Sequence, residues 1–271
     1  RRSRRTSFAA CAGRTAQRRR GYEGPELRAL SLPVSGHCLL QRISGPADPA
    51  RVPGGSRRLF QTGAVCVPAP CLGGELAWPE VDFTALAAVN PDVTAWLYGP
   101  DTGISYPVVQ GTDNDYYLDH LLDGTANSAG CLFVDTSCRP DFSGRNTVIY
   151  GHRMKNGTMF GSLHEYQDES YMEKHPYVYV ITPERERVYQ VFAAIAYDDR
   201  HLMGSFASFT EPEEREAFLS SLKENGDETD VIREDIAVTA DSKLLTLSTC
   251  IKNQSEKRLL VEAVQVYESE T

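Results

Sequence analysis

The sequence of 271 residues contains no long hydrophobic run. Its longest apolar stretches, such as Val191 to Ala196, are far shorter than the ~20 residues that a membrane-spanning helix needs. A secretory signal is not legible either, because the arginines of the first five residues are followed by Thr6 to Gly13, a segment too short and too polar for a signal peptide. The sequence therefore predicts neither a membrane anchor nor a signal peptide.

Lysine is absent from residues 1–75, which hold 13 arginines and only 4 acidic residues. Residues 76–271 hold 15 basic and 33 acidic residues, so the overall charge of −9 averages a basic head and an acidic body. Nucleic acid is an unsuitable partner for such a body, because a phosphate-binding face needs clustered lysine and arginine. The charge balance favours a partner other than nucleic acid.

The head, residues 1–75, also lacks any sustained hydrophobic period, and it carries 7 of the 15 prolines and 10 of the 21 glycines. This composition predicts an atypical segment that is disordered or foreign to the rest of the protein. A GC-rich reading frame translated out of register would give a similar mixture, so a misplaced start is a further hypothesis. The predicted domain division is 1–75 and 76–271.

None of the seven cysteines shows the CxxC spacing of a zinc ribbon. Cys131 and Cys138 have two interpretations, a disulfide in an oxidising compartment or two unpaired thiols, and unpaired thiols are favoured. The acidic runs Asp198-Asp199 and Asp113-Asn114-Asp115 lack the spacing of a calcium loop. We expect no metal and no cofactor.

The body predicts a mostly β fold, a barrel or sandwich with peripheral helices. Asp82 is a suitable N-cap for a helix that runs through Leu86 to Val89, and Pro212 begins a second helical stretch, Glu211 to Glu224. Met159 to Tyr166 is a further helical segment. Eight β-rich runs are separated by turn signals: Thr94 to Tyr98, Tyr106 to Gln110, Cys131 to Asp135, Thr147 to Tyr150, Tyr177 to Thr182, Val188 to Tyr197, Leu244 to Thr249 and Leu259 to Tyr267.

Three residues stand at the ends of these strands in positions that suit chemistry. Cys250 closes a buried run that begins at Leu244, and Arg258 opens the next strand after a connection of seven residues, Ile251 to Lys257. His152 follows another apolar strand directly after Gly151. Each residue alone is more often structural than functional. Together they predict a thiol, an imidazole and a guanidinium near one edge of a sheet.

The combination resembles the sortase family of cysteine transpeptidases. The stretch Thr246 to Cys250 with Arg258 downstream, preceded by Asn146 to His152, carries the likeness. Class B sortases are the most similar group. The segments that resemble that class are Tyr106 to Gln110, Asn114 to Leu118, Met154 to Leu163 and the helix Glu211 to Glu224.

The resemblance covers about residues 78–268 and implies an eight-stranded β-barrel with an N-terminal helix and the inserted helix of class B. It implies cleavage of a C-terminal sorting signal after threonine, with Cys250 as the nucleophile, His152 as the acid and base, and Arg258 as the oxyanion donor. The implied partners are surface proteins that bear the signal and an amine of a peptidoglycan precursor or a pilin. The implied location is the extracytoplasmic face of a Gram-positive membrane.

Secondary candidates for substrate binding surround these residues. Ser248 lies two residues before Cys250, so strand alternation places both side chains on one face. Thr249 lies between them, and Tyr117 and Leu118 belong to a segment that resembles the class B substrate groove. Four other histidines have no partner motif and are interpreted as surface residues: His120, His164, His175 and His201.

Other functions remain open at this stage. A papain-like cysteine peptidase would release its product by hydrolysis, but it needs its cysteine before its histidine in the chain, the reverse of the order here. A non-catalytic β-barrel binding module is the second alternative. A zinc site built from Cys250 and His152 alone lacks enough ligands and is the most remote.

Overall fold

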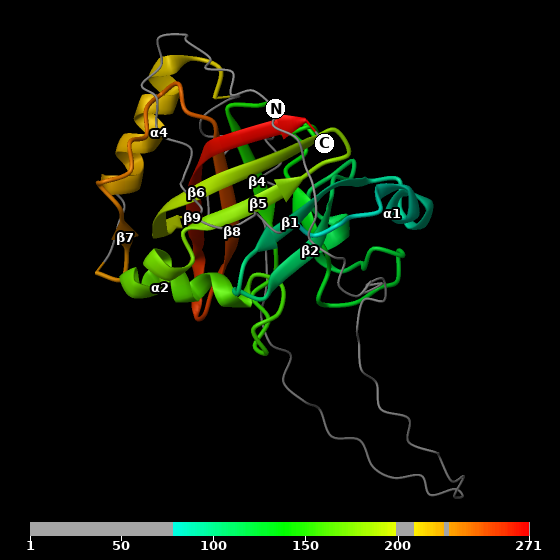
Figure 1. Ribbon diagram of the computed structural model, residues 1–271. Helices are drawn as coiled ribbons and strands as arrows, with labels where there is room; N and C mark the ends of the chain where they lie inside the picture. Colours follow the sequence, from blue (N-terminus) through cyan, green and yellow to red (C-terminus); the bar gives the residue numbers. More distant parts are fainter. Residues whose placement is uncertain (1–77, 199–208, 225–227, 271) are drawn as a thin grey trace, which may run out of the picture. The chain divides into compact units, whose positions relative to one another are not determined.

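The computed structural model describes residues 78–198, 209–224 and 228–270, which form a closed mixed β-barrel with a few peripheral helices (Figure 1). The mostly β, eight-stranded fold expected from the sequence is confirmed. Residues 1–75 lie outside the described part, so the predicted domain division stays a prediction. Among the described residues, no helix has both the length and the apolar character that crossing a membrane requires.

The barrel strands follow the order β5-β1-β2-β3-β4-β8-β9-β6, and β6 pairs with β5 to close the ring. The pairs β2–β3 and β4–β8 are parallel, and the others are antiparallel. A short strand, β7 (Val231–Ile232), adds to β6 outside the ring. The barrel strands are β1 (Val93–Gly99), β2 (Ile104–Val109), β3 (Leu132–Val134), β4 (Asn146–Tyr150), β5 (Tyr177–Ile181), β6 (Arg185–Asp198), β8 (Leu244–Ile251) and β9 (Gln254–Glu270).

The helices expected after Asp82 and over Glu211 to Glu224 are both confirmed. Asp82 caps α1 (Phe83–Val89) by accepting a hydrogen bond from the amide of Ala85 at 2.9 Å. The inserted helix α4 (Pro212–Glu224) buries Phe218 and Leu222. It packs beside β6 (Figure 1), where the hydroxyls of Tyr197 and Ser221 are 2.8 Å apart.

The expected helical segment Met159 to Tyr166 is confirmed, but its bounds are wrong by one to two residues. The segment forms a 3₁₀-helix, η2 (Gly161–Gln167), whose buried side chains Leu163 and Tyr166 are three residues apart. Three residues per turn place such a pair on one face, as a 3₁₀-helix requires. Two short elements had no sequence signal of their own, β7 and the six-residue helix α2 (Glu169–Lys174).

The predicted seven-residue connection between the last two strands is also wrong. Strand β8 continues to Ile251 and β9 begins at Gln254, so the turn itself holds only Lys252 and Asn253. Asn253 has a φ of 61°, a left-handed conformation that asparagine tolerates in a two-residue hairpin turn. The register shifts by three residues of β9 next to Cys250, which pairs with Arg258, whereas Ile251 pairs with Gln254.

Candidate active site

Cys250 is the penultimate residue of β8, and the antiparallel register pairs it directly with Arg258 of β9. Directly opposed residues of two strands have Cβ atoms about 4.5–5.5 Å apart. The thiol is half-buried, and its Sγ makes no hydrogen bond with a described residue. Cys250 therefore presents an uncommitted sulfur on a residue whose direct strand partner is Arg258.

Strand β4 brings His152 to the same end of the barrel. It runs parallel to β8 with Tyr150 opposite Ser248, and this register continues to Gly151, whose amide donates to the carbonyl of Ser248 at 3.2 Å. His152 is the next residue after Gly151, so it leaves the sheet at the level of Cys250. The parallel pairing thus places the imidazole one strand away from the thiol, about 5 Å between backbones.

Gly151 allows a close approach at this point. A Cβ there would lie 2.4 Å from a side-chain carbon of Leu132 and 2.6 Å from one of Phe160. Its carbonyl accepts a hydrogen bond from the hydroxyl of Thr249 at 2.8 Å. The two strand ends are therefore fastened together immediately before His152 and Cys250.

The ring of His152 is held by the segment η1 (Tyr116–Leu118). Its Nε2 lies 2.6 Å from the carbonyl oxygen of Leu118. A carbonyl can only accept, so Nε2 carries a proton and donates it. Nδ1 is consequently the nitrogen that is left to gain and lose a proton.

Arg258 is half-buried and only partly engaged. Its Nη1 donates to the carbonyls of Ser255 and Lys257, at 3.2 and 3.1 Å, in the hairpin that it terminates. Its Nε and Nη2 make no hydrogen bond with the described residues. The guanidinium is thus anchored by one nitrogen and keeps other donors for a ligand.

The predicted substrate-binding residues divide into two groups. Ser248 is 4 % exposed and lies on the same β8 face as Cys250, and Leu118 is half-buried beside His152. Thr249 and Tyr117 are each 2 % exposed, and the hydroxyls of both are engaged internally. Leu118 is therefore the only one of the four that is half-buried rather than buried.

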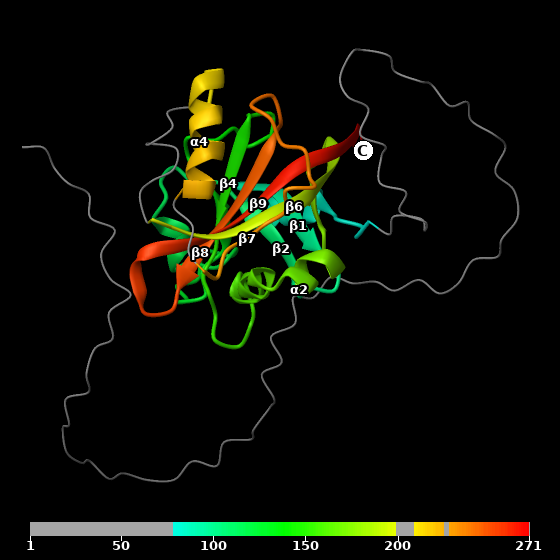
Figure 2. The same ribbon diagram turned by 90° about the vertical axis from the view of Figure 1, so that its left-hand side faces the viewer.

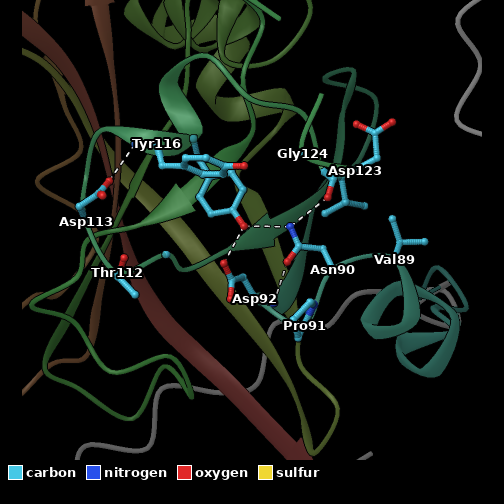
Figure 3. Close-up of a pocket in the computed structure, with 12 residues that line it drawn as sticks. Val89, Asn90, Pro91, Asp92, Thr112, Asp113, Tyr116, Asp123 and Gly124 are labelled. Carbon is cyan, nitrogen blue, oxygen red and sulfur yellow. Dashed lines mark hydrogen bonds between the residues drawn. The ribbon is translucent and has the colours of Figure 1, made fainter. Parts of the chain in front are cut away.

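Tyr117 also lines a pocket of about 450 Å³, which Figure 3 shows with Asn90, Asp92 and Tyr116 labelled. The hydroxyl of Tyr117 donates to Asp92 at 2.7 Å and accepts from the amide of Asn90 at 2.8 Å. Burial, reinforced by the bond to Asp92, raises the pKa of Tyr117 to about 12. The proposed catalytic side chains do not line this pocket, which is formed by Asn90, Asp92, Asp113, Tyr116, Tyr117, Asp123 and neighbouring residues.

His164 is a contact that the sequence did not reveal. It was expected at the surface, but it is half-buried in η2, and its Nε2 donates to the carbonyl oxygen of Cys250 at 3.1 Å. Burial lowers its pKa and so favours the neutral ring. His164 directly follows the segment Met159 to Leu163. Its contact with Cys250 arises only when η2 packs on the end of β8, so the sequence carries no signal for it.

Among the described residues, the other histidines and cysteines make no hydrogen bond or ion pair with His152, Cys250 or Arg258. His120 and His175 are half-buried, so the surface interpretation fails for them too, whereas His201 lies outside the described residues. Cys131 and Cys138 are buried, unbridged thiols, and burial raises the pKa of both. Within the described residues, no group of three or more His, Cys, Asp or Glu side chains is placed to hold a metal.

Comparisons with known proteins identify the fold and its chemistry. The sortase domain family matches residues 97–266, most of the chain. The chain belongs to the sortase family. Sortase B of Listeria monocytogenes is 31 % identical over 182 residues, which cover 65 % of this chain and 71 % of that protein.

Solved structures agree with this assignment to sortase B. Clostridium perfringens sortase B superimposes with a TM-score of 0.61 at 28 % identity, covering 68 % of this chain and 99 % of that one. The substrate complex of Staphylococcus aureus sortase B gives a TM-score of 0.60 at 28 % identity, covering 68 % and 83 %. This chain is a sortase B-like cysteine transpeptidase, and its family places it at the cell envelope.

Proposed function

We propose that this sortase B-like transpeptidase cleaves a C-terminal sorting signal after threonine and transfers the protein to an amine of a peptidoglycan precursor or a pilin. Its place would be the extracytoplasmic face of a Gram-positive membrane. The observation that carries the proposal is the shared end of three strands, where Cys250 opposes Arg258 and His152 follows β4 in parallel register. A cysteine suits this reaction because a thioester stores the acyl group and still reacts with an amine.

In the first half-reaction, the thiol of Cys250 passes its proton to Nδ1 of His152, and the sulfur attacks the carbonyl carbon of the scissile peptide bond. The negative charge that develops on the carbonyl oxygen is stabilised by the free guanidinium donors of Arg258. His152 protonates the leaving amine through Nδ1, because Nε2 is held by Leu118. The carbon–nitrogen bond breaks and a thioester remains on Cys250.

In the second half-reaction, the acceptor amine attacks the thioester carbon. His152 takes the proton that the amine loses, again at Nδ1, and Arg258 stabilises the second tetrahedral oxyanion. The carbon–sulfur bond then breaks, which releases the new amide, and the proton on His152 passes to the sulfur, which restores the thiol. The same residues serve both halves, so one site performs the whole transfer.

Five further side chains support this site. Ser248 and Leu118 would contact the sorting peptide directly. Thr249 would hold Gly151, and Tyr117 would support the backbone that carries Leu118. His164 would orient the backbone of Cys250 by donating to its carbonyl.

A peptide-library assay with defined amine acceptors tests the proposal. Sorting peptides that carry threonine at the cleavage position should yield a ligated product with oligoglycine or a diaminopimelate-type amine, detected by mass spectrometry. A threonine-to-alanine peptide library is the matched control. Cleavage that yields only free acid at every amine concentration would replace transfer with hydrolysis, and cleavage elsewhere would overturn the assigned bond.

A further inference from the structure

A second pocket, of about 660 Å³, lies at the end of the barrel opposite Cys250. It forms where β5 turns into β6 and where β8 begins, and Lys243 lines it immediately before β8. Cys250 is seven residues further along, which places the thiol roughly 20 Å away. Figure 2 shows this separation, with the β8–β9 turn and the C-terminal end of β9 on opposite sides of the barrel.

Arg187 of β6 is the unusual residue of this pocket. Its side chain is only 3 % exposed, and its Nη2 lies 3.0 Å from an oxygen of Glu268 in β9. Its Nε and Nη1 are buried and make no hydrogen bond with a described residue. Nε carries one N–H and Nη1 carries two, so most of the guanidinium's donors are unused. Buried ionised donors rarely stay unpaired, because burial removes the water that would otherwise bind them.

Glu268 is already shared among several donors and cannot satisfy Arg187 alone. Lys243 Nζ lies 3.3 Å from one oxygen, and Arg185 Nη1 lies 3.8 Å from the other. The amide of Gln265 also donates to it at 3.2 Å. Burial opposes the charge of Glu268, but Lys243 and Arg187 more than compensate and lower its pKa. The carboxylate of Glu268 is therefore shared among four donor groups, about as many as its lone-pair sites, and neither Nε nor Nη1 of Arg187 is among them.

The other carboxylates of the pocket stand at its exposed rim. Asp141 and Glu184 are both exposed, and an oxygen of Asp141 accepts from the amide of Ser143 at 3.0 Å. Solvent screens charges in such positions more than charges in the interior. The buried part of the pocket thus holds one ion pair, Arg187 with Glu268, together with the unused N–H donors of Arg187.

We propose that this pocket binds a phosphate group, with Arg187 as its principal donor and Lys243 at the entrance. A phosphate offers three or more acceptor oxygens and up to two negative charges, whereas a carboxylate offers two oxygens and one charge. Phosphate therefore suits the three unused N–H bonds of Arg187 better than a second carboxylate would. The volume lies within the range of small-molecule sites and leaves room for the organic part of a phosphate ester. The pocket is distinct from the transpeptidase site and is independent of the mechanism proposed for it.

Titration of the full chain with inorganic phosphate and with glycerol phosphate, followed by calorimetry at constant ionic strength, tests the site. We expect saturable binding to the wild-type protein and at least a tenfold weaker Kd for Arg187→Gln. Arg233→Gln is the matched control, because Arg233 also pairs with a carboxylate, that of Asp235, away from the pocket. This control should bind as the wild type does.

A variant that fails to fold would be recognised by its loss of transpeptidation, since neither Arg187 nor Lys243 belongs to the catalytic site. Lys243→Gln, whose side chain is 33 % exposed, then provides the second variant and should weaken binding about threefold or more. Absence of saturable phosphate binding, or binding that neither substitution weakens, would overturn the proposal. Acetate that binds as tightly as phosphate would overturn the choice of phosphate.

The source of the phosphate is resolved by two arms of the same experiment. Soluble glycerol phosphate represents a free phosphate ester, and vesicles of phosphatidylglycerol, compared with phosphatidylcholine, represent a lipid headgroup. Binding in either arm that depends on Arg187 supports the site and names its source. Binding in neither arm, with inorganic phosphate also unbound, contradicts it.

Discussion

Two arginines on neighbouring strands lie toward opposite ends of the barrel, and they are held in different ways. Arg258 in β9 is half-buried, and backbone carbonyls of its own hairpin anchor it by Nη1. Arg187 in β6 is buried, and it faces a carboxylate that it shares with other cations. The guanidinium of Arg258 is therefore available to a transient oxyanion. The guanidinium of Arg187 is paired on one side and keeps unused N–H donors on the other.

The contrast teaches that the active end depends on backbone contacts rather than on charge pairing. The ring of His152 donates to the carbonyl of Leu118. The carbonyl of Cys250 accepts a hydrogen bond from the ring of His164. The guanidinium of Arg258 donates to two further backbone carbonyls. Neutral carbonyls orient side chains without neutralising them. The reacting groups therefore keep their charge or proton for the substrate.

Apart from loss of the nucleophile itself, the largest effect should follow from Arg258→Ala. Removing one donor to an oxyanion typically slows catalysis by about 10²–10³-fold, and we expect kcat/KM for transpeptidation to fall by that amount. Arg258→Lys keeps the positive charge but lacks the planar guanidinium, so its kcat/KM should lie between those of the wild type and Arg258→Ala. Steady-state kinetics with a sorting peptide and an amine measure this. Wild-type activity in Arg258→Ala would show that Arg258 contributes no more to catalysis than Arg187 does.

The next largest effect should come from substitution of Glu262, a buried carboxyl on β9. This effect concerns the free energy of unfolding rather than the reaction rate. Glu262 is 0 % exposed, one oxygen accepts from Thr246 at 2.9 Å, and the other has no partner among the described residues. Burial raises its pKa to about 8. Between the ordinary pKa of about 4.3 and about 8, the folded state binds the extra proton, so stability falls as pH rises through this window.

Glu262→Gln should remove this loss, because an amide cannot ionise. We expect the variant to exceed the wild type by about 2–4 kcal/mol in free energy of unfolding near pH 8.5, with little difference near pH 5. Urea denaturation at both pH values measures it. Parallel pH profiles for the two proteins would show that Glu262 is not protonated in the fold.

His164→Leu should have a moderate effect at the active end. Loss of one neutral hydrogen bond costs ~1 kcal/mol, so kcat should fall about five- to tenfold while KM changes little. His164→Gln can still donate to the Cys250 carbonyl and should restore most of the rate. A drop in melting temperature with unchanged kcat would assign His164 to stability alone. Because its pKa is lowered, the wild-type contact should persist at pH 7.

The smallest effect is expected from Arg187→Gln on transpeptidation. The substitution changes the far end of the barrel, so kcat and KM should stay within about twofold of the wild type. The same steady-state assay measures it. A large loss of kcat in a folded variant would show that the two ends of the barrel are coupled.

Much of the fold could be predicted because its strands are long enough to carry a pattern. Leu244 to Thr249 is apolar and β-branched over most of its length, and it is buried as expected. The two-residue strand β7 and the capped turn of α2 are too short to show any period. The tight turn at Lys252–Asn253 was missed because its left-handed asparagine is one residue among several polar ones.

The candidate site was only partly predictable for a similar reason. Cys250, His152 and Arg258 stand at strand ends, and strand ends can be located from sequence. The contacts of His164 with Cys250, and of Leu118 with His152, join segments 86 and 34 residues apart. No local pattern encodes such contacts, because they arise from the packing of η2 and η1 on the barrel. The same holds for Arg187 and Glu268, which meet only when β6 pairs with β9.

Trapping of the acyl-enzyme tests the central claim most directly. Incubation with a sorting peptide in the absence of an amine should add the acyl fragment to Cys250, identified by mass spectrometry of the intact protein and its peptides, and later addition of the amine should release the ligated product. Cys250→Ala should give neither adduct nor product. Wild-type product formation by Cys250→Ala, or an adduct on Cys131 or Cys138, would contradict the account.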